Sequence, residues 1–141
     1  MERLTLTHAT VADLAQIADF VEKAAGVCGF DARTAYQIQM AVDEAASNVV
    51  VHGYGGQPGR IEIQVECIEG AIEILVLDWG RSFDLESVPE PDLEAPLDAR
   101  PIGGLGLFFM RKFMDELEFK FDEVHGNVLR MRRALRAHGQ T

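Results

Sequence analysis

The chain has 141 residues, enough for one domain with a buried core, and its 48% hydrophobic and 26% charged content is typical of globular proteins. Its 23 acidic and 13 basic residues give a formal net charge of −10, which provides no long-range attraction for nucleic acid or for an anionic membrane surface. No apolar run reaches membrane-spanning length and the first residues lack the apolar core of a secretion signal, so we expect a cytoplasmic protein.

The N-terminal part of the sequence predicts one strand followed by two helices. Alternating residues over 2–8 indicate a short strand. Thr10 is a suitable N-cap for a helix over 11–25, whose apolar residues recur on one stripe. Asp31 is expected to cap a second helix over 32–51, which ends at Gly53 and the Gly55-Gly56 pair.

A hairpin follows, and its second strand becomes more apolar towards its end. Residues 61–66 alternate between apolar and polar, Glu69-Gly70 predicts a turn, and an apolar alternation returns over 72–78. One face of this hairpin is therefore expected to be buried, as far as Asp78.

The C-terminal part begins with a long loop and ends with a helix and two strands. Residues 79–102 contain four of the five prolines, and a loop of this length in a compact domain is usually functional or disordered. Glycines at 103, 104 and 106 open a helix to about 116, and strands are predicted over 117–123 and 126–134. The expected fold is α/β, an α+β two-layer sandwich with helices on one face of a mostly antiparallel sheet, in a single domain over 1–141.

Glu44 and Asn48 lie four residues apart in the second predicted helix, and therefore on one helix face. A solvated polar face is the simplest interpretation of the pair. Asparagine, however, is a poor mid-helix residue without a partner, and an amide oxygen beside a carboxylate suits a Mg²⁺–phosphate complex. The pair is therefore a candidate metal and phosphate site.

Asp78-Trp79-Gly80 lies where the apolar strand runs into the long loop. An aspartate in this position often only forms a turn. Alternatively, its carboxylate accepts a hydrogen bond from the amino group of adenine, and Gly80 allows the base to approach the backbone.

Gly103-Gly104-Leu105-Gly106 opens the third predicted helix. Free backbone N–H groups and the positive end of the helix dipole make such a turn a possible phosphate cradle. No Gly-Lys-Ser/Thr follows, as a Walker loop requires, and a loop rather than a strand precedes it, unlike a Rossmann fingerprint.

The cysteines and arginines give weaker signals. Cys28 and Cys67 lie far apart in sequence and outside any CxxC or His-rich spacing, so we expect neither a metal site nor a disulfide. A basic cluster near the C-terminus is either a patch for an anionic partner or a solvated strand end, and we favour the strand end. Its members are Arg130, Arg132, Arg133 and Arg136.

The order of these motifs resembles the GHKL ATPase superfamily, whose Bergerat fold carries an N box, a G1 box and a G2 box that flank an ATP lid. The closer resemblance is to the bacterial anti-sigma-factor serine/threonine kinases of the SpoIIAB and RsbW type. It covers essentially the whole chain. Ser82 stands where many GHKL proteins have a second G1 glycine. The matching strings are residues 43–48 running on to 52–54, residues 78–84, and residues 100–107 followed by Arg111 and 114–116.

The resemblance implies a role for each motif residue. Glu44 would be the general base and Asn48 would bind Mg²⁺. Asp78 would bind the adenine amino group, and Gly80 would form the base-binding turn. Residues 84–102 would be the ATP lid. The triphosphate would be bound by Arg100, Gly103, Gly104, Leu105 and Gly106.

The resemblance also implies an anti-sigma factor that is a protein serine/threonine kinase. With ATP and Mg²⁺, such a protein would hold a sigma factor inactive and phosphorylate a STAS-domain antagonist. A homodimer is expected, with Val11, Leu14 and Phe20 of the first predicted helix as a candidate surface.

Two alternatives to the kinase stay open at this point. One is a non-catalytic switch that uses the nucleotide to change its shape for a partner. The other is an ATP-hydrolysing enzyme that acts on small molecules, for which the sequence suggests no second substrate pocket.

Overall fold

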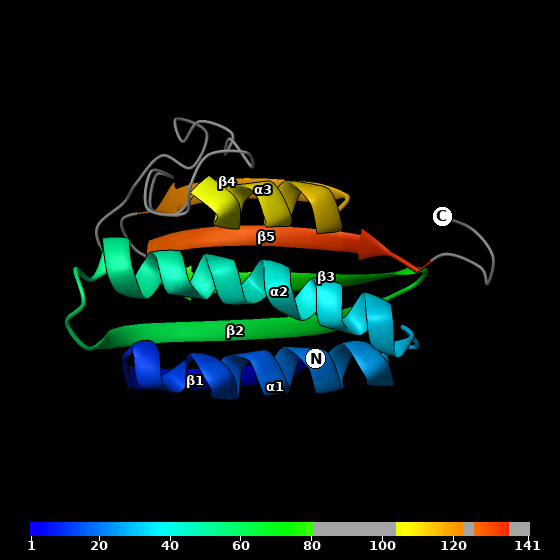
Figure 1. The fold of residues 1–141 in the computed structure, drawn as a ribbon, viewed down its shortest axis with the longest axis horizontal. Coiled ribbons are helices and arrows are strands. Elements are labelled where there is room, and N and C mark those ends of the chain that lie inside the picture. The colour runs from blue at the N-terminus through cyan, green and yellow to red at the C-terminus, as the bar shows by residue number, and fades with distance from the viewer. Residues whose placement is uncertain (81–103, 123–125, 136–141) are drawn as a thin grey trace.

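In the computed structural model, the described residues 1–80, 104–122 and 126–135 form a five-stranded sheet with three α-helices on one face (Figure 1). Of residues 104–108 only the backbone is described. The predicted class, helices on one face of an antiparallel sheet, is confirmed. Within the described residues, no helix is both long and apolar enough to cross a membrane.

The elements follow the predicted order along the chain, with ends that differ by a few residues. The strands are β1 (Glu2–Ala9), β2 (Gly59–Ile68), β3 (Ala71–Asp78), β4 (Glu116–Asp122) and β5 (Gly126–Ala134). The α-helices are α1 (Leu14–Val27), α2 (Ala32–Asn48) and α3 (Gly104–Phe113). A 3₁₀ turn, η1 (Val11–Asp13), leads into α1, and a π-helical turn, η2 (Val49–Gly53), follows α2.

Both predicted helix caps are present. Thr10 and Asp13 form a capping box in which the Thr10 backbone N–H donates to Asp13 Oδ2 at 2.9 Å. Asp31 Oδ1 accepts from the Thr34 N–H at 2.7 Å. Each cap provides a partner for an N–H group that the helix itself leaves unpaired, which fixes where these helical segments begin.

The strand order is β1-β2-β3-β5-β4, and every described pair is antiparallel. Because β5 inserts between β3 and β4, the end of β3 lies beside the start of β5. The register places Asp78 opposite Asn127, and Asn127 opposite Phe121 of β4. Three neighbouring strands therefore contribute side chains to the same end of the sheet, where β3 ends and β5 begins.

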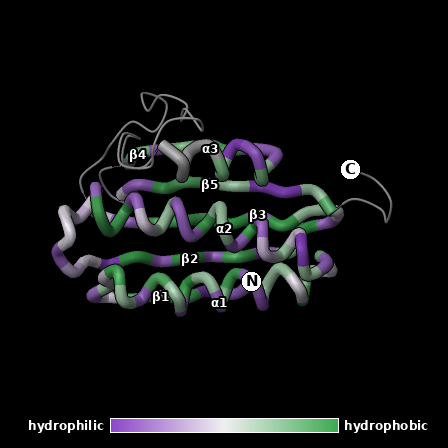
Figure 2. Tube along the Cα trace, in the orientation of Figure 1, coloured by the Kyte–Doolittle hydropathy of each residue, from purple (hydrophilic) through white to green (hydrophobic). Residues whose placement is uncertain are grey.

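The core lies between the sheet and the helices. Alternate residues of the central strands, among them Ile63, Ile74 and Met131, are fully buried against helix residues such as Ile38. Helix α2 lies between α1 and α3 and contacts both (Figure 1). Hydrophobic and hydrophilic positions alternate along the strands and helices, as expected for elements with one buried side (Figure 2).

The predicted basic cluster lies partly on the strand positions that alternate with the core residues. Arg130 Nε is 3.0 Å from Glu73 Oε2, and Arg132 Nη1 is 3.3 Å from Glu116 Oε2. These arginines pair across neighbouring strands, as in a solvated strand of mixed charge. Arg136 lies outside the described residues.

The expectation that the cysteines form no disulfide is wrong. Cys28 follows α1, Cys67 lies in β2, and the two are joined with their Cα atoms 5.5 Å apart. The two cysteines are 39 residues apart in sequence, and this spacing did not reveal that the C-terminal end of α1 lies beside the C-terminal end of β2. Proximity here is a property of the packing of α1 on the sheet.

The candidate dimer surface on the first helical segment is partly covered by the chain itself. Leu14 and Phe20 are partly buried and pack against the core. Val11 is exposed. Two of the three candidate interface residues therefore also pack within their own chain.

Candidate functional site

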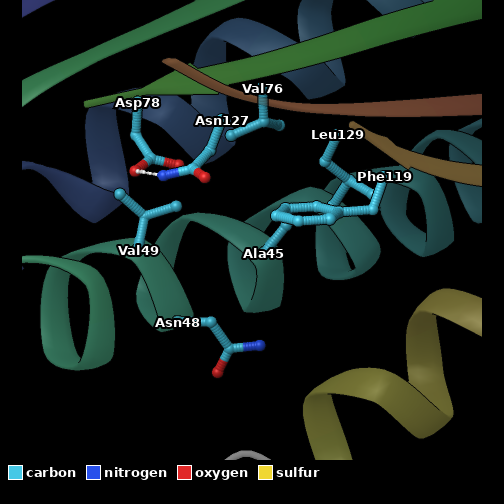
Figure 3. A pocket seen from close by; sticks show the side chains of 8 residues that line it. All are labelled: Ala45, Asn48, Val49, Val76, Asp78, Phe119, Asn127 and Leu129. Carbon is cyan, nitrogen blue, oxygen red and sulfur yellow. Dashed lines mark hydrogen bonds between the residues drawn. The ribbon is translucent and has the colours of Figure 1, made fainter. Parts of the chain in front are cut away.

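A pocket lies between α2 and the edge of the sheet where β3 ends and β5 begins (Figure 3). It brings together two of the predicted site residues, Asn48 and Asp78. Asn48, Asp78 and Asn127 are its polar lining residues, and the other lining residues are apolar. The lining residues are Ala45, Asn48, Val49, Val76, Asp78, Phe119, Asn127 and Leu129.

Asp78 is the buried acid of this pocket, with 4% of its surface exposed. Its Oδ1 accepts from the Gly80 backbone N–H at 3.0 Å and from Asn127 Nδ2 at 2.9 Å. Burial raises the pKa of the Asp78 carboxyl above its ordinary value of 3.8, while these two hydrogen bonds act to lower it. Both donors reach the same oxygen, so Oδ2 is available to a ligand that can donate.

Asn127 was not predicted as a site residue. It is the second residue of β5, 3% exposed, and its Nδ2 donates to Asp78 and to the Gly80 carbonyl oxygen at 3.1 Å. A signal was present in the sequence. Asn127 lies on the same face of β5 as the apolar residues Leu129 and Met131, two and four residues further along the strand. A polar residue at a buried strand position needs a hydrogen-bonded partner.

Gly80 lies where two segments approach closely. A Cβ atom on Gly80 would lie 2.6 Å from the Gly53 carbonyl oxygen, so no side chain fits there without a backbone shift. The Tyr54 hydroxyl accepts from the Trp79 N–H at 2.9 Å and donates to the Arg60 carbonyl oxygen. The turn after β3 is therefore held against the segment that follows α2.

Gly126 is a second close approach that the sequence did not reveal as part of the site. It has a φ of +78°, and a Cβ there would collide with the Asp78 carbonyl oxygen. Glycine adopts this backbone conformation without a steric penalty. Its small size lets β5 begin directly beside the end of β3.

Asn48 ends α2 and is 5% exposed. Figure 3 shows its amide turned away from the Asp78–Asn127 pair, and no hydrogen bond joins it to the other lining residues drawn. After Asn48 the helix continues as the wider π-helical turn η2. The Tyr54 N–H donates to the Val49 carbonyl oxygen at 2.9 Å there. Single π-helical turns often occur at functional sites.

Glu44 lies one turn before Asn48 and is partly buried, but it does not line the pocket. Burial raises the pKa of its carboxyl above the ordinary 4.5, and the neighbouring negative charge of Asp43 raises it further. A carboxylate whose pKa is raised is a stronger proton acceptor in general base catalysis.

The remaining predicted residues can be placed only in part. Arg100, Gly103, Ser82 and the predicted lid, 84–102, lie outside the described residues. Gly104, Leu105 and Gly106 form the first turn of α3, as predicted, and α3 packs beside α2. A helix start offers backbone N–H groups that favour anions, and in Figure 1 α3 begins at the same end of the molecule at which α2 ends.

The arrangement suits a flat, largely apolar ligand with a hydrogen-bond donor on one edge. Val76, Leu129 and Phe119 offer apolar contact, and Asp78 offers the acceptor. Asn48 offers one hard oxygen ligand for a cation, and no three His, Cys, Asp or Glu side chains converge as a metal site in the part of the chain that the structure describes. A metal here would need most of its ligands from a bound anion and water.

Residues 7–133 match the family described as the histidine kinase-like ATPase domain. The chain is 33% identical over 90 residues to serine-protein kinases RsbW of Bacillus thuringiensis (strain Al Hakam), Bacillus cereus (strain 03BB102) and Bacillus anthracis (strain A0248). Each match covers 61% of this chain and 56% of the relative, so the chain spans about half the length of the curated relatives that it matches.

A solved structure with a similar fold is the histidine kinase domain of the Erythrobacter litoralis EL346 blue-light activated histidine kinase. It aligns with a TM-score of 0.53 and 18% sequence identity, over 88% of this chain and 64% of that one. At this identity the likeness concerns the fold alone.

Proposed function

Since the chain belongs to the family of histidine kinase-like ATPase domains, we propose that it binds Mg·ATP and transfers the γ-phosphoryl group to a serine or threonine of a partner protein. The observation that carries the proposal is the buried Asp78 carboxylate, with one oxygen held by two donors and the other available in an apolar pocket. Adenine offers a flat ring and an amino group, which complement this pocket.

We assign the base to the pocket of Asp78 and Gly80. Asp78 Oδ2 accepts from the amino group of the base, and the Gly80 N–H holds the other oxygen, Oδ1, in place. The apolar walls supply the remaining contact. The residues present therefore fit an adenine base.

The phosphates and the metal are assigned to the other end of the pocket. Asn48 supplies one oxygen ligand to Mg²⁺, which prefers hard oxygens and keeps several waters and phosphate oxygens around it. The first turn of α3, with Gly104, Leu105 and Gly106, offers backbone N–H groups to the phosphates. Arg100 and Gly103 complete the proposed set on the strength of the sequence motif.

Glu44 is proposed as the general base. It takes the proton of the attacking serine or threonine hydroxyl while that oxygen bonds to the γ-phosphorus. The bond from the γ-phosphorus to the β–γ bridging oxygen breaks, and ADP leaves. Phosphoryl transfer depends mainly on positioning and charge stabilisation, so the base contributes about 10²–10⁴ in rate.

The partners are proposed from the curated relatives, whose names describe serine-protein kinases. We propose a STAS-domain antagonist as the phosphoryl acceptor, a sigma factor as the protein held inactive, a homodimer as the assembly and the cytoplasm as the location. Among residues 1–80, 104–122 and 126–135, Arg130 and Arg132 are paired with acids, in keeping with a protein partner rather than nucleic acid.

The test is phosphorylation of a STAS-domain protein encoded next to this chain, followed with labelled ATP. Glu44→Gln should keep ATP and partner binding but lose most phosphotransfer, whereas Asn48→Ala should weaken Mg·ATP binding and phosphotransfer together. If the wild type binds the partner and ATP but never transfers phosphate, the kinase assignment fails. A nucleotide-dependent binding switch would then replace it.

A further inference from the structure

The side-chain oxygen of Asn127 is buried and has no hydrogen-bond partner. Within the part of the chain that the structure describes, no donor lies within hydrogen-bond distance of Asn127 Oδ1. Asn127 lines the pocket and is 3% exposed.

The orientation of the Asn127 amide is fixed by its surroundings. Its other terminal atom lies 2.9 Å from Asp78 Oδ1 and 3.1 Å from the Gly80 carbonyl oxygen, and both of these are acceptors. Only the NH₂ group can face two acceptors, so the oxygen must point the other way. Figure 3 shows this oxygen on the side of the amide away from the bond to Asp78.

A purely structural role explains the NH₂ group of Asn127 but not its side-chain oxygen. The NH₂ group ties β5 to the turn after β3, and that role needs no acceptor. A buried acceptor without a partner costs free energy, which the fold tolerates where a ligand or water supplies the missing donor. The Asp78 carboxylate lies directly beside it in the same pocket, so a ligand group with two adjacent N–H bonds satisfies both residues.

We propose that Asn127 is a second specificity-determining residue for the base, and that its Oδ1 accepts one N–H of the adenine amino group while Asp78 accepts the other. The inference rests on the proposed ATP site. An exocyclic amino group has two N–H donors, and two acceptors from neighbouring strands are available to it. A base with a carbonyl oxygen in that position, held in the same orientation, faces two acceptors and is rejected.

The proposal is tested by removing the amino group from the ligand and the amide from the protein. ATP and purine riboside triphosphate, which lacks the amino group, are titrated by calorimetry into the wild type and Asn127→Ala. The preference for ATP should be about 3- to 10-fold smaller in Asn127→Ala, because one of two hydrogen bonds to the amino group is gone. Tyr36→Phe, a variant of an exposed residue of α2 outside the pocket, should keep the wild-type preference.

Asn127→Ala also removes the bond to Asp78, so a second measurement uses the unaltered protein. N6-methyl-ATP keeps one N–H. If both acceptors are used, it should bind the wild type about 3- to 10-fold more weakly than ATP, and an affinity within 2-fold would overturn the proposal. The proposal is also overturned if the ATP preference of Asn127→Ala equals that of the wild type.

The two proposals fail in different ways. If the wild type binds no ATP, the proposed function itself is wrong. If it binds ATP and Asp78→Asn weakens that binding, while Asn127→Ala leaves the preference for the amino group unchanged, only the role of Asn127 is wrong.

Discussion

At the scale of single residues, Asp78 has two different oxygens. Oδ1 is held by the Gly80 N–H and by Asn127 Nδ2, so an asparagine in its place would turn its own oxygen towards these donors. Its NH₂ group would then occupy the position of Oδ2. The amide would present a donor where the ligand also presents a donor.

We therefore expect Asp78→Asn to weaken ATP binding strongly while leaving the fold intact. Loss of a buried hydrogen bond to a charged group costs roughly 1.5–3 kcal/mol, or about 10- to 150-fold in affinity. Calorimetric titration measures the change, and the circular dichroism spectrum is the control for folding. An affinity close to that of the wild type would exclude Asp78 as the acceptor for the base.

Glu44 and Asp43 give a prediction about pH. The pKa of Glu44 is raised by burial and by the charge of Asp43, and a general base acts only when it is deprotonated. As the pH is lowered, the rate of phosphotransfer should therefore begin to fall at a pH above 4.5, the ordinary pKa of a glutamate. Asp43→Asn removes one cause of the raised pKa, so the fall should move to lower pH.

The measurement is the rate of phosphotransfer as a function of pH under saturating ATP and partner. Glu44→Gln is the matched variant. It should lose most of the rate, and the remaining rate should no longer fall at acidic pH (the acidic limb of the pH profile). An acidic limb that stays in place in Asp43→Asn would show that a group other than Glu44 controls it.

At the scale of elements, Tyr54 connects three segments. Its hydroxyl joins the Trp79 N–H, after β3, to the Arg60 carbonyl oxygen of β2, and its ring lies against Gly80. Removal of the hydroxyl in Tyr54→Phe should lower the free energy of unfolding by about 0.5–1.5 kcal/mol. Urea denaturation measures this change.

The chain provides a matched control for that variant. Tyr36, the only other tyrosine, is 55% exposed on α2. Tyr36→Phe should change the stability by less than about 0.5 kcal/mol. Equal effects of the two substitutions would mean that the Tyr54 hydroxyl does not stabilise the turn.

The disulfide joins the end of α1 to β2 and closes a segment of 39 residues that contains all of α2. A cross-link over such a segment restricts the unfolded chain and stabilises the fold by about 2–4 kcal/mol. A reducing agent should therefore lower the unfolding midpoint of the wild type.

Cys28→Ser, Cys67→Ser and the double variant are the controls for the disulfide. Each should unfold near the midpoint of the reduced wild type and should not respond to the reducing agent. If reduction leaves the wild-type midpoint unchanged, the disulfide does not contribute to stability.

At the scale of the whole molecule, the proposed ligand connects the two layers. The pocket takes residues from α2 and from three strands, so the site exists only when helix and sheet are packed together. A ligand that binds only the folded state stabilises it by mass action. Mg·ATP at 100 times its Kd should add about 2.7 kcal/mol to the free energy of unfolding.

Asp78→Asn is the control for this linkage. At the same ATP concentration, its weaker affinity should leave a stabilisation of about 1.4 kcal/mol or less. Thermal or chemical unfolding with and without nucleotide measures both proteins. Equal stabilisation of the two would mean that ATP binds somewhere other than the Asp78 pocket.

The sequence determined the local structure because the signals for it are local. Periods of 2 and 3.6 residues identified the strands and helices, Thr10 and Asp31 indicated helix starts, and each needs only neighbouring residues. The motif order also predicted that Asn48 and Asp78 belong to one site, and the two line one pocket.

Only the tertiary structure decided the contacts between distant segments. The insertion of β5 beside β3 places Asn127 against Asp78, and the packing of α1 places Cys28 beside Cys67. Periodicity states which side of an element is buried but not which element covers it. Strand order, register and helix placement settle that, because they depend on how all the buried faces fit together at once.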